Sequence, residues 1–592
     1  MRGSMKTIRR EHPRPQFIRE NWTLLDGTWA FRFDDENEGM EAGWAQGLSQ
    51  IVDIQVPFTY ETEKSGINNQ AHHSVVWYEK QLTLDEAKRY TIIFEGADYY
   101  SQVWLNGQLL GTHRGAYERF EFDLTGIVQG ENRLVIRVED SLACEQPRGK
   151  QRWLKDNFGC WYVQTTGIWK SVWLEEQYSP KRLSSVKMTP NVDSDQIIFE
   201  PIVKGSTVES EQELIFEAEV TFEGSRVSSY RGILPHTMTP IALETRVKKD
   251  ACWGTKQWSP ETPYLYNVTF RLYTEEGQLL DEVSSYFGMR KIAIRNGQVL
   301  LNNHQLYQRL ILDQGYWEES GLTPPSVAAL EKDIDRIVEM GYNGLRKHQK
   351  LEDERFLYLC DEKGVLVWSE MASTYAFNDQ AVDNFIDEWL AIVRQNYNHP
   401  SIITWVPFNE SWGIKGIEQD EKQQHFTESV YYLTKTIDSE RPVITNDGWV
   451  HTISDIITLH DYEEYEQLFS ERYEDKEAVL NEAYQFNKDF YAFADGYSYK
   501  GQPIMISEFG GIAFTTEKQE DWGYGNQVEN EQAFMTRFDG IHRAIQELPY
   551  IVGYCYTQLT DVEQEVNGLL TTDRAPKVDL EEIKKINERR LK

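Results

Sequence analysis

The chain has 592 residues, and its 95 Asp and Glu against 61 Lys and Arg give a formal net charge of −34. At about 150 residues per domain, this length predicts three to four domains rather than one. A hydrophobic fraction of 40% excludes wholesale disorder. Because so acidic a chain repels phosphates and anionic lipid, neither nucleic acid nor a membrane is an expected partner.

The cysteines and the N-terminal residues indicate the cellular compartment in which the protein is expected. The five cysteines are odd in number, and no two have CxxC spacing, which argues against a disulfide framework or a structural zinc site. The N-terminal residues carry positive charge but no apolar run typical of a secretory signal, and no stretch approaches 18 apolar residues. We therefore expect a cytoplasmic protein without metal or cofactor.

The first 288 residues are rich in short, β-branched and aromatic segments. In residues 1–180 these segments are separated by turn signals such as Asn106-Gly107, which predicts a jelly-roll β-sandwich. Residues 181–288 continue with strands spaced 10–20 residues apart, typical of an immunoglobulin-like sandwich. The predicted strands of the first part are 76–84, 90–96, 101–111 and 132–140.

Residues 289–592 change in pattern, since short apolar strands now alternate with amphipathic helices. In the predicted helix 326–340, Leu330, Ile334, Ile337 and Val338 recur at helical spacing. Eight such units predict a (β/α)8 TIM barrel. An open doubly wound sheet is disfavoured, because no Gly-rich phosphate loop follows a strand. The predicted strands are 306–312, 343–348, 365–370, 402–410, 442–447, 456–460, 503–510 and 552–558.

Polar residues end these strands, where barrel enzymes carry their chemistry. Glu410 ends the fourth strand and Glu508 the seventh, so the two carboxylates are expected to face each other. Facing carboxylates suit glycosidic cleavage, with one as acid and one as nucleophile; a separation of roughly 5–5.5 Å means retention of configuration. Mutual repulsion is expected to raise the pKa of one of them.

Several segments are similar to glycoside hydrolase family 2. NHPSIITWVPFNE at 398–410 resembles its acid/base signature, 507–510 its nucleophile strand, and 568–577 its last barrel turn. Upstream, 22–34, 76–84, 103–125 and 165–175 resemble its sugar-binding-type domain. The resemblance implies a retaining exo-glycosidase of three domains. It assigns Glu410 as acid/base and Glu508 as nucleophile, with Asn409, His348 and Arg346 as substrate or supporting contacts.

Two departures from the family bear on the substrate. The stretch 370–376 lacks the extra Glu and His of the metal-dependent β-galactosidases, so an active-site magnesium is not expected. The stretch 565–570 lacks the Asn-x-Lys of the β-glucuronidases. Lys347 is an alternative anion site, and Asp461 or Tyr462 an alternative to a tyrosine that touches the nucleophile.

Further sugar contacts are expected from strand ends and from loops at the mouth. Carboxylates accept paired hydrogen bonds from sugar hydroxyls, so an acidic pocket suits a neutral sugar. Aromatic rings at the mouth are candidates for stacking on sugar faces. The remaining candidates are Asp313, Asp447, His460, Trp449, Trp522 and Tyr556.

These patterns predict a retaining exo-glycosidase acting on a small glycoside or oligosaccharide, β-galactoside first. The alternatives are an α-L-arabinofuranosidase or β-galactofuranosidase, and then a β-hexuronidase that rests on Lys347. Two rivals of other kinds are a non-catalytic carbohydrate-binding protein and a metal-dependent hydrolase using His348 and His460. The resemblance leaves open whether the chain forms a homo-oligomer.

Overall fold

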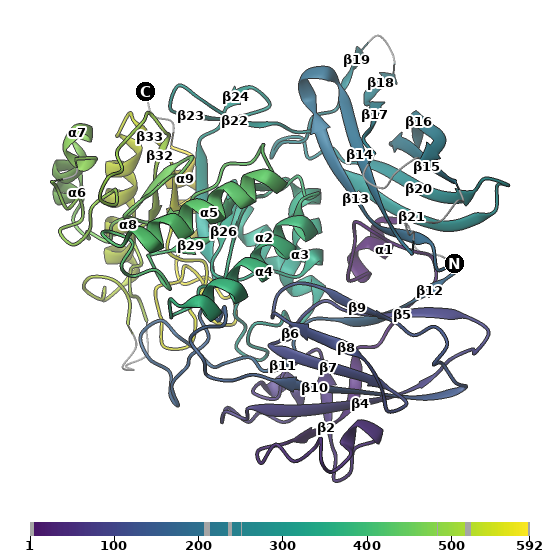
Figure 1. Cartoon of the computed structure of the whole chain (residues 1–592). Helices are drawn as coiled ribbons and strands as arrows, with labels where there is room; N and C mark the ends of the chain where they lie inside the picture. Colours follow the sequence, from purple (N-terminus) through teal and green to yellow (C-terminus); the bar gives the residue numbers. More distant parts are fainter. Residues whose placement is uncertain are drawn as a thin grey trace.

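The computed structural model describes residues 5–205, 213–234, 239–249, 252–481, 483–515 and 522–589. Figure 1 shows two β-sandwiches, in purple to blue and in blue to teal, beside a barrel in teal, green and yellow. The β-sandwich and barrel architecture predicted from the sequence is confirmed. The short helix α1 (Met5–Glu11) lies between these parts, and its Arg10 pairs with Glu331 and Glu362 of the barrel.

The first sandwich pairs a four-stranded and a six-stranded antiparallel sheet. Alternate side chains, such as Trp29 and Phe31 on one strand and Ile136 and Val138 on another, fill the space between the sheets. The four-stranded sheet has the order β1 (Trp22–Leu24), β12 (Val172–Gln177), β5 (Arg89–Phe94), β9 (Phe120–Asp123); the six-stranded sheet has the order β3 (Val52–Val56), β2 (Gly27–Phe33), β4 (Val75–Thr83), β10 (Glu131–Glu139), β7 (Tyr100–Leu105), β8 (Gln108–Arg114); β6 (Ala97–Asp98) pairs β11 (Gly167–Ile168).

The second sandwich has a three-stranded and a four-stranded sheet and a separate hairpin. Strand β15 buries every second residue, the pattern of a strand with one face on a core. The sheets are β13 (Arg182–Asn191), β14 (Gln196–Lys204), β17 (Ile241–Glu244), and β16 (Ser225–Leu234), β15 (Leu214–Phe222), β20 (Tyr266–Thr274), β21 (Leu279–Phe287); the hairpin is β18 (Arg246–Lys249) with β19 (Cys252–Thr255).

A small antiparallel sheet leads into the barrel and helps to close it. Ile292, Val299 and Leu301 of this sheet join Trp258 and the inward side chains of the barrel strands in one buried cluster. This packing fills the barrel interior and leaves the opposite, carboxyl end of the strands for the site. The sheet is β22 (Ile292–Arg295), β23 (Gln298–Leu301), β24 (His304–Gln305).

The barrel strands are parallel and follow the predicted order. Seven form one sheet, and the two-stranded sheet of β29 and β30 supplies the fifth position, where Gly448 carbonyl accepts from the His460 amide at 3.1 Å. The strands are β25 (Gln308–Asp313), β26 (Gly344–Lys347), β27 (Leu366–Glu370), β28 (Ile402–Val406) with β29 (Phe408–Asn409), β30 (Asn446–Asp447), β31 (Ile457–His460), β32 (Ile504–Glu508) and β33 (Ile551–Tyr556).

The helices depart from the prediction at two points. The fifth unit has no helix, because the nine residues between β30 and β31 are too few for a helical crossover. In α2, Val338 is 47% exposed whereas Asp333 is buried against Arg574, so the expected apolar face is rotated. The helices are α2 (Val327–Glu339), α3 (Glu354–Lys363), α4 (Asp379–Asn396), α5 (Glu421–Ile437), α6 (Glu466–Tyr473), α7 (Lys476–Val479), α8 (Glu531–Gln546) and α9 (Leu580–Asn587).

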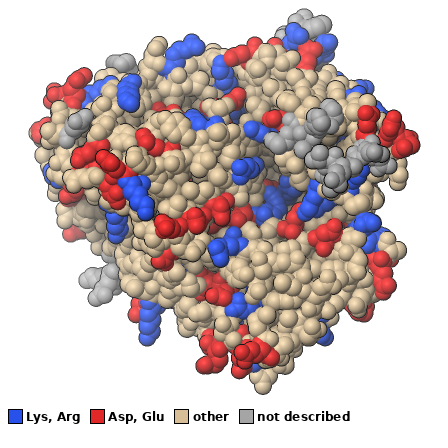
Figure 2. All heavy atoms as spheres, viewed as in Figure 1, with Lys and Arg blue, Asp and Glu red and all other residues tan. Residues whose placement is uncertain are grey.

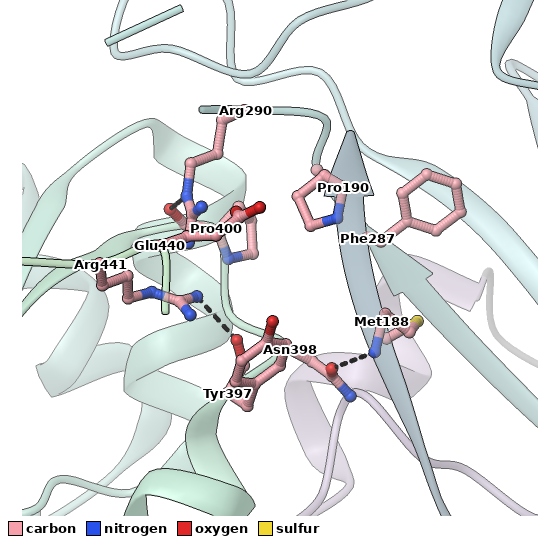
Figure 3. Close-up of a pocket in the computed structure, with 10 residues that line it drawn as sticks. Met188, Pro190, Phe287, Arg290, Tyr397, Asn398, Pro400, Glu440 and Arg441 are labelled. Carbon is pink, nitrogen blue, oxygen red and sulfur yellow. Dashed lines mark hydrogen bonds between the residues drawn. The ribbon is translucent and has the colours of Figure 1, made fainter. Parts of the chain in front are cut away.

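The second sandwich docks on the barrel through polar contacts around a very small cavity (Figure 3). The Asn398 side chain accepts from the Met188 amide at 2.7 Å, and the hydroxyls of Thr189 and Tyr397 are hydrogen-bonded at 2.9 Å. Within the barrel, Arg441 donates to the Tyr397 carbonyl at 2.7 Å. The cavity volume is about 10 Å³, which suffices for one water molecule. This place therefore joins domains and is not a ligand site.

Charged side chains of both signs lie on the surface of the molecule. In Figure 2 acidic side chains lie in several small clusters across the visible face, with basic side chains between them. No helix among the described residues combines the length and the apolar character needed to cross a bilayer.

Candidate active site

Arg346 on β26 organises the mouth of the barrel. Its guanidinium donates to Glu370 Oε2 at 2.5 Å, to Glu508 Oε1 at 2.7 Å and to Asn409 Oδ1 at 2.6 Å, and it lies 2.6 Å from Asp447 Oδ2. Its side chain is fully buried. One planar cation with five donors thus fixes side chains from four other strands.

The backbone of Glu410 is strained. Its φ is +51° and that of Ser411 is +57°, in the left-handed region that non-glycine residues rarely adopt. The Glu410 amide donates to the Asp447 carbonyl at 2.9 Å, and the Ser411 amide to Asn446 Oδ1 at 2.9 Å. These bonds hold a conformation that costs about 1–3 kcal/mol per residue, as is typical of functional sites.

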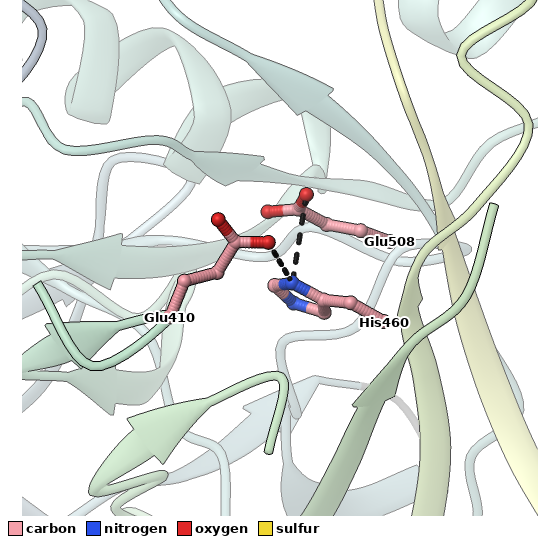
Figure 4. Close-up of side chains that lie close together, drawn as sticks. All are labelled: Glu410, His460 and Glu508. Carbon is pink, nitrogen blue, oxygen red and sulfur yellow. Dashed lines mark hydrogen bonds and ion pairs between the residues drawn. The ribbon is translucent and has the colours of Figure 1, made fainter. Parts of the chain in front are cut away.

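His460 lies beside the two predicted catalytic carboxylates and contacts both (Figure 4). Its Nδ1 is 2.8 Å from Glu410 Oε1 and 3.6 Å from Glu508 Oε2, and its Nε2 is 3.0 Å from Asp447 Oδ2. Gly448 makes room for the ring, because a Cβ there would meet His460 Nδ1 at 2.7 Å.

The contacts of His460 and Glu410 determine their pKa values. Burial alone lowers the pKa of His460, but the Glu508 and Asp447 carboxylates outweigh burial and raise it to about 10. Burial likewise raises the pKa of Glu410, and the hydrogen bond and charge of His460 outweigh it, so the Glu410 pKa is lowered. The expected repulsion-driven rise of the Glu410 pKa is therefore wrong, because a protonated His460 contacts both carboxylates.

Glu508 receives a second anchor from Tyr462. The Tyr462 hydroxyl donates to Glu508 Oε2 at 2.5 Å and lies 3.1 Å from Thr557 Oγ1. Its ring stacks on Tyr524, with centroids 3.4 Å apart and planes 3° from parallel. The structure thus places Tyr462, rather than Asp461, against the carboxylate of Glu508.

His348 and Asn409 both contact the guanidinium of Arg346. His348 Nδ1 lies 3.2 Å from Arg346 Nη2 and 3.0 Å from Glu370 Oε1. Burial, with Lys150 and Arg346 nearby, lowers the pKa of His348 well below its usual value, so the ring is neutral.

The two predicted loop tryptophans occupy different places. Trp449 stacks on Phe490 at 3.9 Å and meets the His460 ring edge-on at 5.5 Å; its indole N–H is buried without a partner among the described residues. Trp522 donates its indole N–H to the Gly159 carbonyl of the first sandwich at 2.9 Å. Trp449 is thus beside the site, and Trp522 holds the domains together.

Tyr556 does not face the site, contrary to our prediction. It is buried, and its ring packs on Phe509 and on Phe538 and His542 of α8. Side chains alternate along a strand, so Cys555 points into the barrel and Tyr556 points out toward the helix layer.

Four other predicted contacts already have protein partners. Lys347 lies 2.5 Å from Asp313 and 3.1 Å from Glu352, below Phe356. Asp461 lies 2.5 Å from Arg472. Asp447, as described, is bound by Arg346 and His460. These charges are satisfied within the protein, which weakens both the anion role of Lys347 and the free acidic lining expected for a neutral sugar.

A loop of the first sandwich, residues 140–166, reaches this site and was missed from the sequence. Tyr375 hydroxyl donates to the Gly149 carbonyl at 2.5 Å, and the Gly149 amide donates to the Ser373 carbonyl at 3.1 Å. The Tyr162 hydroxyl donates to Glu565. The signal was present as a 27-residue segment with few strand features and many aromatics, a length uncommon for a simple connection.

Trp161 of this loop lies close to the site. Its ring meets Trp412, two residues after Glu410, edge-on at 5.0 Å, and Tyr375 at 5.6 Å. Trp153 stacks on Tyr375 at 4.1 Å. These rings form an aromatic wall beside Glu410.

Among the described residues, one group of side chains has the atom types and spacing to bind a metal ion. Its ligand atoms, from Glu410, His460 and Glu508, lie within 4.8 Å of one another. Arg346 and the protonated His460 already supply positive charge there. A divalent cation would have to displace His460 and its proton from both carboxylates, so these residues do not fit a metal well.

A separate cavity of about 950 Å³ opens between the first sandwich and the barrel loops. Gln164, Tyr316, Trp317, Asp561 and Glu563 are among its lining residues, and Glu410 and Glu508 are not.

Comparisons with known proteins agree with this geometry. Residues 292–590 match "Glycosyl hydrolases family 2, TIM barrel domain", 22–177 match the family's sugar binding domain, and 182–290 match "Glycosyl hydrolases family 2". The chain belongs to glycoside hydrolase family 2. It is therefore a glycosidase, an enzyme that hydrolyses O-glycosyl bonds.

Individual relatives carry two substrate names. A β-glucuronidase of Paenibacillus borealis is 23% identical over 93% of this chain and 94% of its own length. A β-galactosidase of Thermoanaerobacter pseudethanolicus is 26% identical over 74% of this chain, which spans 59% of that enzyme. The crystal structure of Ruminococcus gnavus β-glucuronidase shares the fold, with a TM-score of 0.78, 18% identity, and coverage of 96% and 98%.

Proposed function

We propose that this glycosidase removes a terminal sugar with retention of configuration, with Glu508 as nucleophile and Glu410 as acid/base. The observation that carries the proposal is the closeness of the two carboxylates, whose oxygens come within 4.8 Å of each other. Retaining enzymes hold this pair at about 5–5.5 Å, whereas inverting enzymes leave about 6.5–9.5 Å for a water molecule.

In the first step a Glu508 oxygen attacks the anomeric carbon, and the bond to the leaving oxygen breaks. That oxygen takes a proton from the Glu410–His460 pair, which holds one proton between them. In the second step water attacks the glycosyl–Glu508 ester, Glu410 accepts the proton of the water, and the sugar leaves with Glu508 restored as a carboxylate.

The surrounding groups hold the proposed nucleophile, Glu508, in place. Arg346 and the Tyr462 hydroxyl each bind one oxygen of Glu508. Charge-assisted bonds of this kind fix the position and orientation of the carboxylate. Asn409, held by Arg346, presents its amide beside the pair and is proposed to bind the hydroxyl next to the anomeric carbon.

The sugar itself has two leading candidates. A β-galactoside was the first choice from the sequence, and relatives named β-galactosidase support it. Relatives named β-glucuronidase support a β-hexuronide equally. A panel of nitrophenyl β-galactoside, β-glucuronide, β-galacturonide, α-arabinofuranoside and β-galactofuranoside ranks them by kcat/KM.

The test of the catalytic assignment is Glu508→Gln, which keeps shape and hydrogen bonding but removes the nucleophile. We expect hydrolysis of the best nitrophenyl glycoside to be abolished while the circular dichroism spectrum is unchanged. Undiminished turnover by the folded variant would overturn the assignment and favour a non-catalytic role for this barrel mouth.

A further inference from the structure

The loop 140–166 brings a lysine of the first sandwich into the barrel mouth. Lys150 is 9% exposed, and its carbonyl accepts from the Tyr162 amide at 2.9 Å, which fixes the backbone. Gly149 beside it has a φ of +61°, and a Cβ there would meet the Gln349 carbonyl oxygen at 2.5 Å. The close approach of loop and barrel therefore requires glycine, and it directs Lys150 inward.

The loop is held from both sides. Tyr162 and Val163 bind Glu565 and Glu563 of the barrel, and Gly159 accepts from Trp522. Tyr375 binds the Gly149 carbonyl. Lys150 is thus placed by a framework of bonds, as a residue needs to be if it is to select a substrate.

The ammonium of Lys150 lacks a matched anion. Among the described residues, no carboxylate oxygen lies within 4 Å of it, although it acts on the charges of Glu410 and His348. Cys160 is its near neighbour, but burial raises the pKa of that thiol, so the sulfur is uncharged. The charge of Glu565 raises the pKa of Lys150, but no ion pair joins the two among the described residues, and Glu565 already accepts from Tyr162, Gln314 and Asn567.

A buried ammonium without an ion pair is costly, and a ligand that brings a carboxylate removes that cost. A neutral sugar offers hydroxyl groups that cannot balance the charge. The other candidate cation of the barrel mouth, Lys347, already forms ion pairs with Asp313 and Glu352. Of these two lysines, Lys150 is therefore the one that remains available to a substrate.

Building on the proposed function, we propose that Lys150 is a specificity-determining residue that pairs with the carboxylate of a terminal uronic acid. The enzyme is then a β-hexuronidase whose acid-group anchor comes from the first sandwich and not from the barrel. The aromatic wall of Trp161, Tyr375 and Trp412 lies beside it. Lys150 Nζ is itself 5.9 Å from the Trp161 ring centre, so the proposed anchor lies beside this wall.

The test compares Lys150→Met, which keeps the length of the side chain and removes its charge, with Lys155→Met. Lys155 is an exposed lysine of the same loop and serves as the matched control. For each variant, kcat/KM is measured with nitrophenyl β-glucuronide, β-galacturonide and β-galactoside, and folding is checked by thermal melting.

We expect Lys150→Met to lose on the order of 100-fold in kcat/KM on the uronides, the scale of a charge-assisted bond. Its activity on the galactoside should change by less than about threefold, and Lys155→Met should match the wild type on all substrates. Lys150→Arg should keep part of the uronide activity.

Two results would overturn the inference while leaving the proposed function intact. One is a wild type that hydrolyses the galactoside and neither uronide. The other is a parallel loss on acidic and neutral substrates in Lys150→Met, which would mean that Lys150 tunes Glu410. A wild type inactive on every glycoside would instead refute the proposed function, and this inference with it.

Discussion

His460 Nδ1 lies 2.8 Å from Glu410 Oε1 and 3.6 Å from Glu508 Oε2, so one imidazolium contacts both carboxylates proposed for catalysis. Asp447 holds the other ring nitrogen at 3.0 Å. The proton needed by the leaving group therefore belongs to a Glu410–His460 pair. This arrangement makes the pH dependence of the enzyme a property of two residues.

The first prediction concerns His460→Gln. A histidine with a raised pKa keeps its proton below that pKa and loses it as the pH rises through it, here about 10. The pair thus stays protonated through the neutral range. Without His460, the proton must come from Glu410 alone, and the basic limb of kcat/KM should move down by at least about one pH unit.

The measurement is kcat/KM from pH 4 to 10 for wild type and His460→Gln. Glu421→Gln, at an exposed position of α5 outside the described contacts with the catalytic pair, serves as the control and should keep the wild-type profile. A basic limb that stays in place when His460 is replaced would show that His460 holds no part of the catalytic proton.

The second prediction concerns Arg346→Gln and stability. Arg346 balances Glu370 and Asp447, whose side chains are both fully buried. Removing the cation leaves uncompensated buried carboxylates, which should lower the free energy of unfolding by about 3–5 kcal/mol. Urea denaturation followed by fluorescence measures the loss.

Arg336→Gln is the matched control, because Arg336 forms a single exposed pair with Glu339 on α2. That change should stay within about 0.5 kcal/mol of wild type. Equal stability of the two variants would contradict the role given to Arg346 as the central support of the barrel mouth.

The third prediction separates two tyrosines. Tyr462→Phe removes the hydroxyl that binds Glu508, and kcat should fall by roughly 10- to 100-fold, the range expected for one hydrogen bond to a charged group. Tyr556→Phe should leave kcat unchanged, because that ring lies against α8. Initial rates at saturating nitrophenyl glycoside give both kcat values. A large loss of kcat in Tyr556→Phe would indicate that Tyr556 faces the substrate, as the sequence predicted.

Much of this site could be predicted, because barrel strands carry their chemistry at one end. The strand-end rule and the family resemblance together located Glu410, Glu508 and Arg346, which the structure brings into one cluster. The order of the eight strands followed from their apolar runs. Strand ends alone do not give the direction of a side chain, so Tyr556 and Asp461 were placed inward although they point outward.

Contacts between segments that are far apart in the chain could not be predicted from the sequence. The separation of Glu410 from His460 is 50 residues, and the ion pair that lowers the Glu410 pKa appears only when β31 lies beside β30. Lys150 is more distant still, since it belongs to another domain. No periodicity marks a residue whose role depends on how one domain docks on another.

The most direct test of the central claim is covalent trapping on Glu508. A 2-deoxy-2-fluoro glycoside of the preferred sugar, with a good leaving group, slows both steps but lets the first outrun the second, so the glycosyl-enzyme accumulates. Peptide mass spectrometry should find one fluorosugar on the peptide containing Glu508. Label on a peptide without Glu508, or release of the inverted anomer by the natural reaction, would contradict the account.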